Sequence, residues 1–384
     1  MPAKPPYGVL AVTGGGSHQE DYARGFAADP RCRVIGVTDE RDVNERRARL
    51  NRKLADEMKV PLLPDLDEAL KRPDVHIVSV CTEHERQGRV ALRAVEAGKH
   101  LYVDKPMAGS LGDADRIVAA LRQRGLRGQM FSQVNQGYAL HAKRIVDSGR
   151  LGELKAIHCD LMFCKGWPGG APLGRKRKEA ATPTNFLHPD AKREMFNIAV
   201  YSIAMIRWMT KREILSVYST TSNYFFEEHY KRDFEDFGMI ALTLQGGLTA
   251  TMTAGRIGWM SHLGGGPNLT RLYGSKGSVL IDRFQPRAEF ASDIMEWKRP
   301  SKDPDDPMCF WRSTQDRQGV TLRPEWMMPD AMPAKTDQSM FVDCVEQGRE
   351  AEVSVYDAAK VLEALFAAYR SAASGEVIKL PLPR

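Results

Sequence analysis

Short apolar runs alternate with longer amphipathic stretches over the first 130 residues of the chain. Short, continuous apolar runs are typical of strands buried on both faces of a sheet, whereas apolar residues three and four apart indicate helices. We predict strands at 8–12, 33–38, 75–81 and 100–103, and helices at 18–28, 41–59, 66–71, 86–97 and 111–124. Strands that alternate with helices form βαβ units, so this part of the chain predicts a parallel sheet.

The pattern changes near residue 150. A long strand is predicted at 154–163 and a strongly helical stretch at 194–209. Further strands are predicted near 214–226, 237–245, 248–257, 268–273 and 277–283, and a closing helix carries an apolar stripe from Val361 to Tyr369. Successive strands with few helices between them indicate a largely antiparallel sheet, which predicts a second domain of different architecture.

The composition is that of an ordinary globular protein. The chain has 384 residues, of which 42% are hydrophobic and 27% charged, so disorder and coiled coil are excluded for the chain as a whole. A net charge of +6 is a mild excess that suits an anionic small ligand as well as a nucleic acid. The one basic run, 175–178, lacks interleaved aromatic residues. We therefore interpret it as a solvated segment and expect no nucleic-acid partner.

The six cysteines form no CxxC pair, and no histidine cluster has the spacing of a zinc site. We therefore expect reduced thiols and no bound metal. The apolar stretch near the N-terminus is too short for a signal peptide, and no run approaches the ~20 apolar residues of a membrane span. These features predict a cytoplasmic protein with no membrane partner.

Three consecutive glycines, Gly14 to Gly16, lie between the first predicted strand and the first predicted helix. Glycines allow the backbone to approach a pyrophosphate, and a helix N-terminus offers free N–H groups to it. Gly14 and Gly16 fill the first two places of a G-x-G-x-x-G fingerprint, but Gln19 stands at the third. The pattern favours a dinucleotide site that includes Ser17 and His18, and the alternative is a glycine-rich turn of any α/β protein.

Asp39 ends the second predicted strand. An acid at this place can accept hydrogen bonds from the adenosine ribose diol, and it repels a 2′-phosphate. Asp39 therefore favours NAD over NADP, although Arg41, two residues later, argues the other way and keeps NADP open. The alternative role of Asp39 is to cap the following helix, and both roles can coexist.

The segment from Gly98 to Pro106 carries the pattern A-G-K-H-x-x-x-[ED]-K-P, with Asp104 at the acidic position. At this distance from a glycine-rich first turn, the pattern resembles the Gfo/Idh/MocA oxidoreductase family, whose members act mainly on sugars, cyclitols and related polyols. Further marks of the family follow in the right order at 145–153, 272–278 and 368–372. The resemblance covers nearly the whole chain.

The resemblance implies an α/β protein of two domains. Residues 1–133 would form an N-terminal Rossmann NAD(P)-binding domain. Residues 134–384 would form a C-terminal α/β domain with a large, mostly antiparallel open sheet. The open face of that sheet commonly forms the oligomer interface in the family, so a homodimer or homotetramer is expected.

The resemblance also implies that Lys105 lies beside the nicotinamide and the reacting carbinol. An ammonium group there can donate a hydrogen bond to the substrate oxygen and stabilise developing negative charge. Asp104 and Pro106 belong to the same cofactor-side motif, and the sharp turn of the motif predicts a cis peptide bond before Pro106. Thr82 and His84 are further cofactor-side candidates, although the segment 82–87 departs from the commoner T-P-x-H-x-H.

One departure from the family affects the chemistry directly. Most members carry D-x-x-x-H on the first long helix of the second domain, and here Asn197 and Tyr201 stand at those places. Residues four apart share a helical face. In one interpretation Tyr201 is the acid/base, because the Lys105 ammonium would favour its phenolate, and Asn197 orients a substrate hydroxyl. In the others, the site has lost ordinary proton transfer, or Tyr201 only packs in the core.

Other substrate contacts are weaker candidates. They are Asn135, Tyr138, Trp167 and His188. A second cluster could imitate a metal site but fits no standard ligand spacing, so we expect a solvated loop or an interface there. Its members are Glu228, His229, Asp233 and Asp236.

The sequence thus predicts an NAD(P)-dependent oxidoreductase that transfers a hydride between the carbinol carbon of a sugar-like or cyclitol-like polyol and nicotinamide. Two alternatives remain. The first is an enzyme that retains NAD and uses transient oxidation for elimination, epimerisation or glycoside cleavage. The second is a non-catalytic, cofactor-binding regulatory protein.

Overall fold

The computed structural model describes residues 6–149, 151–166, 173, 193–258, 266–276, 278–282, 303–308, 310–311, 313–314 and 335–384. It divides into two compact units, which are described here one at a time. The first comprises Met1–Asn135 and Lys335–Lys360, and the second comprises Gln136–Ala334 and Val361–Arg384. The division differs from a single boundary after residue 133, because a segment near the C-terminus belongs to the first unit.

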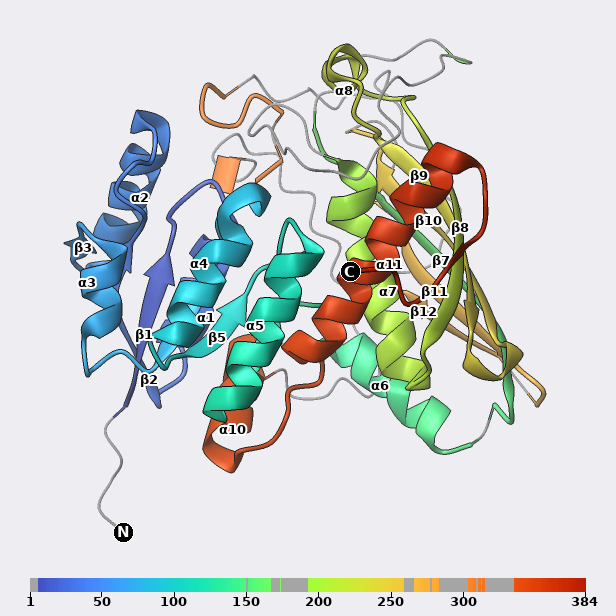
Figure 1. Ribbon diagram of the computed structural model, residues 1–384, viewed down its shortest axis with the longest axis horizontal. Coiled ribbons are helices and arrows are strands. Elements are labelled where there is room, and N and C mark those ends of the chain that lie inside the picture. The colour runs from blue at the N-terminus through green and yellow to red at the C-terminus, as the bar shows by residue number, and fades with distance from the viewer. Residues whose placement is uncertain are drawn as a thin grey trace, which may run out of the picture. The chain divides into compact units, whose positions relative to one another are not determined.

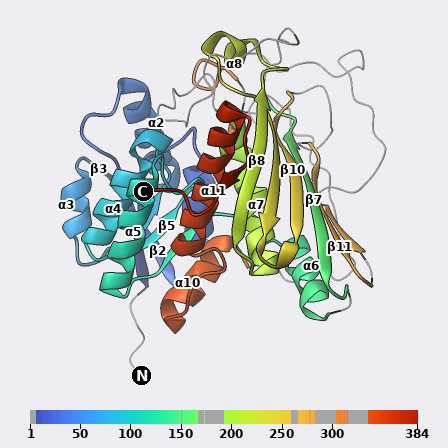
Figure 2. The same ribbon diagram turned by 45° about the vertical axis from the view of Figure 1, so that its right-hand side comes forward.

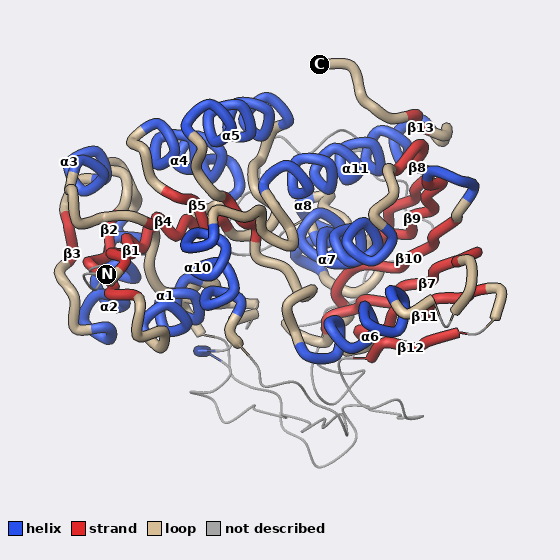
Figure 3. Tube along the Cα trace, turned by 90° about the horizontal axis from the view of Figure 1, so that it is seen from below, coloured by secondary structure: helices blue, strands red, loops and turns tan. Residues whose placement is uncertain are grey.

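The first unit contains a six-stranded parallel sheet with the order β3-β2-β1-β4-β5-β6. Its strands are β1 (Tyr7–Val12), β2 (Cys32–Thr38), β3 (Leu62–Leu63), β4 (Ile77–Val80), β5 (His100–Val103) and β6 (Gly128–Met130). Its helices are α1 (Gln19–Ala27), α2 (Glu45–Met58), α3 (Leu66–Lys71), α4 (His84–Glu96), α5 (Leu111–Arg124) and α10 (Asp337–Gln347). Helices cover both faces of the sheet, with α4 and α5 on one face and α1 and α10 on the other (Figures 1 and 3). This is the doubly wound architecture that the alternating pattern predicts.

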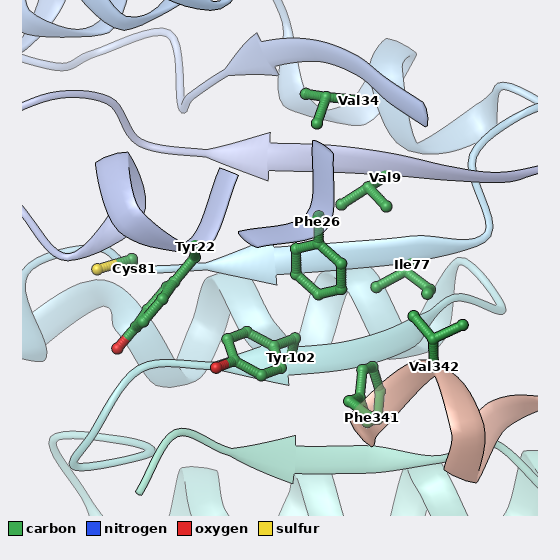
Figure 4. Packing of buried hydrophobic residues seen from close by; sticks show 9 residues of the cluster. All are labelled: Val9, Tyr22, Phe26, Val34, Ile77, Cys81, Tyr102, Phe341 and Val342. Atoms are coloured by element: carbon green, nitrogen blue, oxygen red, sulfur yellow. The ribbon is translucent and has the colours of Figure 1, made fainter. Parts of the chain in front are cut away.

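The core of the first unit includes residues from its distant segment. Phe341 and Val342 of α10 pack with Phe26 of α1 and Tyr102 of β5, and all four side chains are buried (Figure 4). The ring of Tyr102 lies 5.3 Å from that of Phe26 and 5.7 Å from that of Phe341. The apolar face of α10 thus completes the first core, which explains why residues 335–360 belong to the first unit.

The second unit contains a seven-stranded sheet with the order β12-β11-β7-β10-β9-β8-β13. Its strands are β7 (Leu154–Phe163), β8 (Ile214–Ser222), β9 (Phe237–Leu244), β10 (Thr249–Arg256), β11 (Asn268–Gly274), β12 (Ser278–Asp282) and β13 (Ile378–Lys379). Among the described strands of this sheet, only β7 and β10 pair in parallel, so the sheet is mostly antiparallel, as predicted.

Three helices pack on one face of the second sheet (Figures 2 and 3). They are α6 (Gly137–Asp147), α7 (Glu194–Thr210) and α11 (Val355–Ser374), while α8 (Glu227–Arg232) follows β8. Among the described residues, the opposite face carries no helix, so it is the open face of the sheet. No helix in the described part of the chain has the length and apolar character needed to cross a membrane.

Candidate active site

The glycine loop joins β1 to α1, and close packing requires its first glycine. A β-carbon on Gly14 would lie 2.4 Å from Cα of Asn51 and 2.6 Å from the carbonyl oxygen of Leu50, both in the backbone of α2. Gly16 has a φ of +67°, a left-handed conformation that glycine adopts without strain. The turn is therefore bare of side chains at the carboxyl end of β1, directly before the N-terminus of α1.

Gln19 explains why the third glycine of the fingerprint is absent. Its side chain is fully buried and bonds to Ser79 of β4 at both ends. The amide Nε2 donates to the carbonyl oxygen of Ser79 at 2.9 Å, and the Ser79 hydroxyl donates to Oε1 at 2.9 Å. The glycine at this place normally allows close packing of helix and strand. Here the Gln19 side chain, with both of its polar atoms hydrogen-bonded, joins α1 to β4 instead.

Asp39 lies at the carboxyl end of β2, as predicted, and its carboxylate is surrounded by donors. Thr13, Asn51 and Arg86 donate to Oδ2 at 3.0, 2.8 and 3.3 Å. Arg86 and the backbone N–H of Glu40 donate to Oδ1 at 2.5 and 2.9 Å. Asp39 does not cap α2, because Asn44 occupies the cap position and accepts from the N–H of Arg47.

Arg41 points to another partner. Its side chain is 74% exposed and pairs with Asp65, the residue that caps α3. Arg86, which the sequence analysis did not single out, is instead the arginine that contacts Asp39. The sequence signal for Arg86 was its place in segment 82–87, which departs from the commoner family pattern.

The altered segment 82–87 supports the turn that carries Lys105. Thr82 is buried after β4, and His84 is the first residue of α4. Gln87, at the place of a commoner histidine, is fully buried, and its Nε2 donates to the carbonyl oxygens of Asp104 at 2.8 Å and Pro106 at 2.6 Å. These two bonds fix the backbone on either side of Lys105.

Asp104 lies at the centre of a buried hydrogen-bonded group. Nδ1 of His18 lies 3.1 and 3.2 Å from its two oxygens, the Tyr22 hydroxyl donates to it at 2.5 Å, and the Cys81 thiol donates at 3.4 Å. Burial alone would raise the pKa of Asp104, but the charge and hydrogen bond of His18, the charge of Lys105 and the bond from Tyr22 hold it well below its usual range. Asp104 therefore stays a carboxylate.

The thiol of Cys81 stays protonated, because burial and the neighbouring Asp104 carboxylate raise its pKa. His18, Cys81 and Asp104 each offer one potential metal-ligand atom, and these atoms lie within 4.8 Å of one another, which is close enough to bind one metal ion. Their hydrogen bonds satisfy the carboxylate without an ion.

Lys105 follows β5 at the same edge of the sheet, and its side chain is only 2% exposed. The peptide bond between Lys105 and Pro106 is cis, as the motif predicts. The carboxyl ends of β1, β4 and β5 thus bring together His18, Cys81, Asp104 and Lys105. In open α/β sheets, ligands bind outside the carboxyl ends of the strands, at the point where the strand order reverses. That point lies between β1 and β4.

In the second unit, Asn197 and Tyr201 lie one turn apart on α7, as predicted. They are 6% and 7% exposed. The Tyr201 ring contacts Phe163 of β7 edge-on, with centroids 6.3 Å apart. The Asn197 amide donates to Glu194 at 3.5 Å. Their catalytic roles stay predictions.

A buried ionic cluster lies at the start of α7. Glu194 is fully buried, and one of its oxygens lies 3.0 Å from Nε of Arg256 and 3.2 Å from Nε2 of His229. Burial would raise the pKa of Glu194, but Arg256 and His229 lower it to about 2. We expected a solvated loop or an interface at this cluster. The Glu228 side chain is 41% exposed, but a solvated position is wrong for His229 and Asp236, because both side chains are fully buried. Asp236 accepts three backbone N–H bonds from residues 224–226, a role that sequence spacing does not reveal.

The weaker substrate candidates divide into two groups. Asn135 is buried, and its amide donates to Asp337 at 2.7 Å, so the contact that the structure shows is with α10. Tyr138 lies in α6, but its side chain is outside the described residues, as are Trp167 and His188.

Comparisons with known proteins agree with this architecture. The N-terminal model of the oxidoreductase family with an NAD-binding Rossmann fold, GFO_IDH_MocA, matches residues 9–132, and the family's C-terminal domain model matches residues 139–280. The chain belongs to the Gfo/Idh/MocA oxidoreductase family. Its first unit is accordingly an NAD-binding Rossmann domain.

Relatives in the family match only part of their own length. The uncharacterized oxidoreductase YhhX of Escherichia coli is 38% identical over 94 residues, which is 24% of this chain and 27% of that protein. An inositol 2-dehydrogenase of Pseudomonas fluorescens is 32% identical over 156 residues, 39% of this chain and 44% of that protein. Matches therefore span less than half of these relatives.

A solved structure extends the similarity of fold to nearly the whole chain. Scyllo-inositol dehydrogenase from Lactobacillus casei, with bound NAD(H) and scyllo-inositol, aligns with a TM-score of 0.70 at 16% identity. The alignment covers 97% of this chain and 99% of that one. At this identity, the match establishes the fold alone.

The described residues of the Rossmann domain fit a dinucleotide. The β-carbon positions of Gly14 and Gly15 are filled by the α2 backbone and by the Glu20 carboxylate, so these glycines let the loop pack closely. The N-terminus of α1, which begins at Gln19, supplies the N–H groups that a pyrophosphate would need. Asp39 directly follows β2, where an acid can bind the adenosine ribose of a dinucleotide. One feature disagrees with simple ribose binding, since five hydrogen bonds already reach the Asp39 carboxylate.

Proposed function

We propose that the protein is an NAD(P)-dependent oxidoreductase that acts on a CH–OH group of a sugar-like or cyclitol-like polyol. The observation that carries the proposal is the buried Lys105, which follows a strand at the dinucleotide edge of the Rossmann sheet and adjoins the Asp104 carboxylate. The names of relatives supply the substrate class, because several are inositol 2-dehydrogenases.

In this proposal Lys105 binds and polarises the reacting oxygen. Its ammonium group donates a hydrogen bond to the substrate hydroxyl and stabilises negative charge that develops on the oxygen as the C–H bond breaks. The charges of Lys105 and the Asp104 carboxylate attract each other. When NAD is bound, its nicotinamide accepts the hydride.

The hydroxyl proton needs an acceptor, and we assign it to Tyr201. Tyr201 stands where most members of the family carry the histidine of D-x-x-x-H, and Asn197 stands where they carry the aspartate. A phenolate accepts a proton from the hydroxyl, and the Asn197 amide can both donate to and accept from a neighbouring substrate hydroxyl. Tyr201 is thus proposed as acid/base and Asn197 as an orienting group.

A substrate screen tests the proposal. Sugars and cyclitols are incubated with the protein and NAD, and reduced nicotinamide is followed by its absorbance. Lys105→Met and Tyr201→Phe should each lower kcat by about 100-fold or more, the usual contribution of a positioned acid or base, while the thermal midpoint stays close to that of the unmodified protein. Near-full turnover of Tyr201→Phe would show that Tyr201 is not the acid/base.

Isotope exchange separates net redox chemistry from transient oxidation. An enzyme that retains NAD and oxidises its substrate transiently would release no reduced cofactor. It would still incorporate solvent deuterium at the substrate carbon next to the transient carbonyl. Exchange without net reduction would therefore replace the proposed dehydrogenase by an eliminase, epimerase or glycoside-cleaving enzyme. Activity of neither kind, with cofactor binding retained, would favour a regulatory protein.

We also propose that the open face of the second sheet joins copies of the chain into a homodimer or homotetramer. Large apolar side chains on its strands are partly exposed, including Tyr218, Met239, Tyr273 and Leu280. Light scattering after gel filtration tests this, and Met239→Asp should shift the mass toward that of a monomer. A cytoplasmic location is proposed from the cysteines, since the five within the described residues are all free thiols.

A further inference from the structure

The guanidinium group of Arg86 pairs with the Asp39 carboxylate at the end of β2, where an acid commonly binds the ribose in Rossmann domains. Its two terminal nitrogens lie 2.5 and 3.3 Å from the two carboxylate oxygens, a two-pronged ion pair. Nη2 also donates to the Thr13 hydroxyl at 3.0 Å, and that hydroxyl donates to Asp39 at 3.0 Å. Both charged side chains are buried, at 9% and 3% exposed.

The carboxylate of Asp39 has no acceptor capacity left in this arrangement. A carboxylate offers about four lone-pair sites. Five hydrogen bonds from Arg86, Thr13, Asn51 and the Glu40 N–H reach it. A ribose diol could bond to Asp39 only by displacing one of these donors.

Neighbouring charges hold Arg86 in place. Nε of Arg86 donates to Glu83 at 2.6 Å, and Glu83 also pairs with Arg47 at 2.8 Å. Arg47 in turn donates to the carbonyl oxygen of Gly15 at 2.8 Å, which links the group to the glycine loop. Arg86 also faces Glu40 at 3.4 Å, and Glu40 pairs in turn with Arg89 at 2.8 Å and Arg93 at 3.1 Å. The three carboxylates around Arg86 are thus shared among four guanidinium groups, and the Asp39 charge is locally compensated.

The effect of Asp39 on cofactor choice depends on that neutralisation. A bare carboxylate at the end of β2 accepts from a 2′-hydroxyl and repels a 2′-phosphate. A carboxylate paired with Arg86 does neither, whereas a guanidinium group is a bidentate partner for phosphate oxygens. A 2′-phosphate would therefore meet a compensated carboxylate beside a guanidinium group rather than an uncompensated negative charge. It could bond to Arg86 by replacing the weakest present acceptor, Glu40, which lies 3.4 Å away.

We propose that Arg86 determines how this protein recognises the 2′ position of the cofactor, and that the Rossmann domain accepts NADP as well as NAD. The inference rests on the proposed function, since it concerns the same dinucleotide site. Arg86 is a specificity-determining residue in this proposal, and Arg41, which pairs with Asp65, is not.

Binding measurements without substrate test the inference. Dissociation constants for NAD and NADP are measured by calorimetry on the full chain and on Arg86→Gln, Arg86→Lys and Arg89→Gln. Arg89 is the matched control. It lies one turn later on α4, has the same charge, is 56% exposed and pairs with Glu40 at 2.8 Å rather than with Asp39.

The full chain should bind NADP with a dissociation constant within about tenfold of that for NAD. Arg86→Gln uncovers the Asp39 charge, so it should raise the NADP-to-NAD ratio of dissociation constants by about tenfold or more. Arg89→Gln should leave the ratio within about twofold, and Arg86→Lys should give an intermediate ratio because it keeps the charge but not the fork. Adding Asp39→Asn to Arg86→Gln should restore NADP binding, because the repelling charge is gone.

A ratio above about 100-fold for the full chain would overturn the inference even if the Arg86 variants fail to fold. Equal shifts of the ratio in Arg86→Gln and Arg89→Gln would also overturn it, since the effect would then be one of net charge. If the chain binds NAD but discriminates strongly against NADP, the proposed function stands and only this inference fails. If neither dinucleotide binds, the proposed function fails as well.

Discussion

Replacement of Asp337 by asparagine tests a buried carboxyl group that joins α10 to the Rossmann sheet. Asp337 accepts hydrogen bonds from Tyr102 at 2.5 Å, Gln129 at 2.8 Å and Asn135 at 2.7 Å. Burial raises its pKa from 3.8 to about 6, and these three bonds only partly oppose the shift. The folded protein therefore binds this proton more tightly than the unfolded chain does.

The sign of the pH dependence follows from that difference. A carboxyl group with a raised pKa contributes stability that is fully present below its unfolded pKa of 3.8 and is lost as pH rises through about 6. Between pH 5 and pH 7.5, the loss for Asp337 amounts to about 1 to 2 kcal/mol. An amide at this position does not titrate, so Asp337→Asn should gain that amount relative to the unmodified protein over the same range.

The hydrogen-bond network around residue 337 can accommodate the side-chain amide of an asparagine. Oδ1 of Asn135 and Oε1 of Gln129 are buried without a hydrogen-bond partner among the described residues. A rotated Asn135 amide could therefore accept from the new NH₂ group, which keeps the network satisfied. The variant should fold, and its effect should lie in the pH dependence.

The assay is thermal unfolding of both proteins at pH 5 and pH 7.5. The midpoint difference, variant minus unmodified, should rise by a few degrees between the two pH values. Asp343→Asn, on the same helix, is the control, because Lys335 and Arg31 hold the pKa of Asp343 below its usual range despite burial. Its midpoint difference should not change between pH 5 and pH 7.5. A constant difference for Asp337→Asn would refute the reasoning.

Three further substitutions, with Gly112→Ala as a control, address packing, the Lys105 turn and the Glu194 ion pair. Gly14→Ala places a β-carbon 2.4 Å from the backbone of α2, so it should destabilise the protein by about 1 to 3 kcal/mol in thermal unfolding. Gly112→Ala, which meets nothing within 4 Å among the described residues, should not destabilise it. Gln87→Ala removes both bonds to the carbonyl groups that flank Lys105, and we expect turnover to fall about tenfold with NAD affinity unchanged. Unaltered turnover would show that Gln87 does not position the lysine. Glu194→Gln leaves the buried guanidinium group of Arg256 without its counter-charge and should cost about 3 to 5 kcal/mol of stability, so an unchanged melting midpoint would contradict the ion-pair assignment.

Local signals predicted the helices and strands well where the chain carries its own caps. The helix predicted at 111–124 is α5 with the same limits. Ser110 caps its start, and Gly125, with a φ of +64°, ends it. The strand at 100–103 also has the predicted limits, because an apolar run stands between polar neighbours. Each of these signals lies within a few residues of the element that it defines.

Contacts between distant segments could not be predicted in this way. Sequence position placed Asp39 at the ribose site, but its pairing with Arg86, 47 residues later, depends on how α4 packs against β2. The burial of His229 depends on a partner 35 residues earlier, Glu194. In both cases, polar residues that resemble surface residues in the sequence are buried because a hydrogen-bonding partner from a distant segment faces them in the fold.

The return of α10 to the first unit has a consequence for synthesis and folding. An N-terminal Rossmann domain would ordinarily be able to fold while the rest of the chain is still being made. Here Phe341 and Val342 are part of its core, and Asp337 receives three of its buried hydrogen bonds. The nascent cofactor domain would therefore expose apolar surface until residues 335–360 have left the ribosome. A fragment ending at residue 135 should bind chaperones or aggregate, and a cofactor-binding fragment would need the distant segment supplied in the same chain.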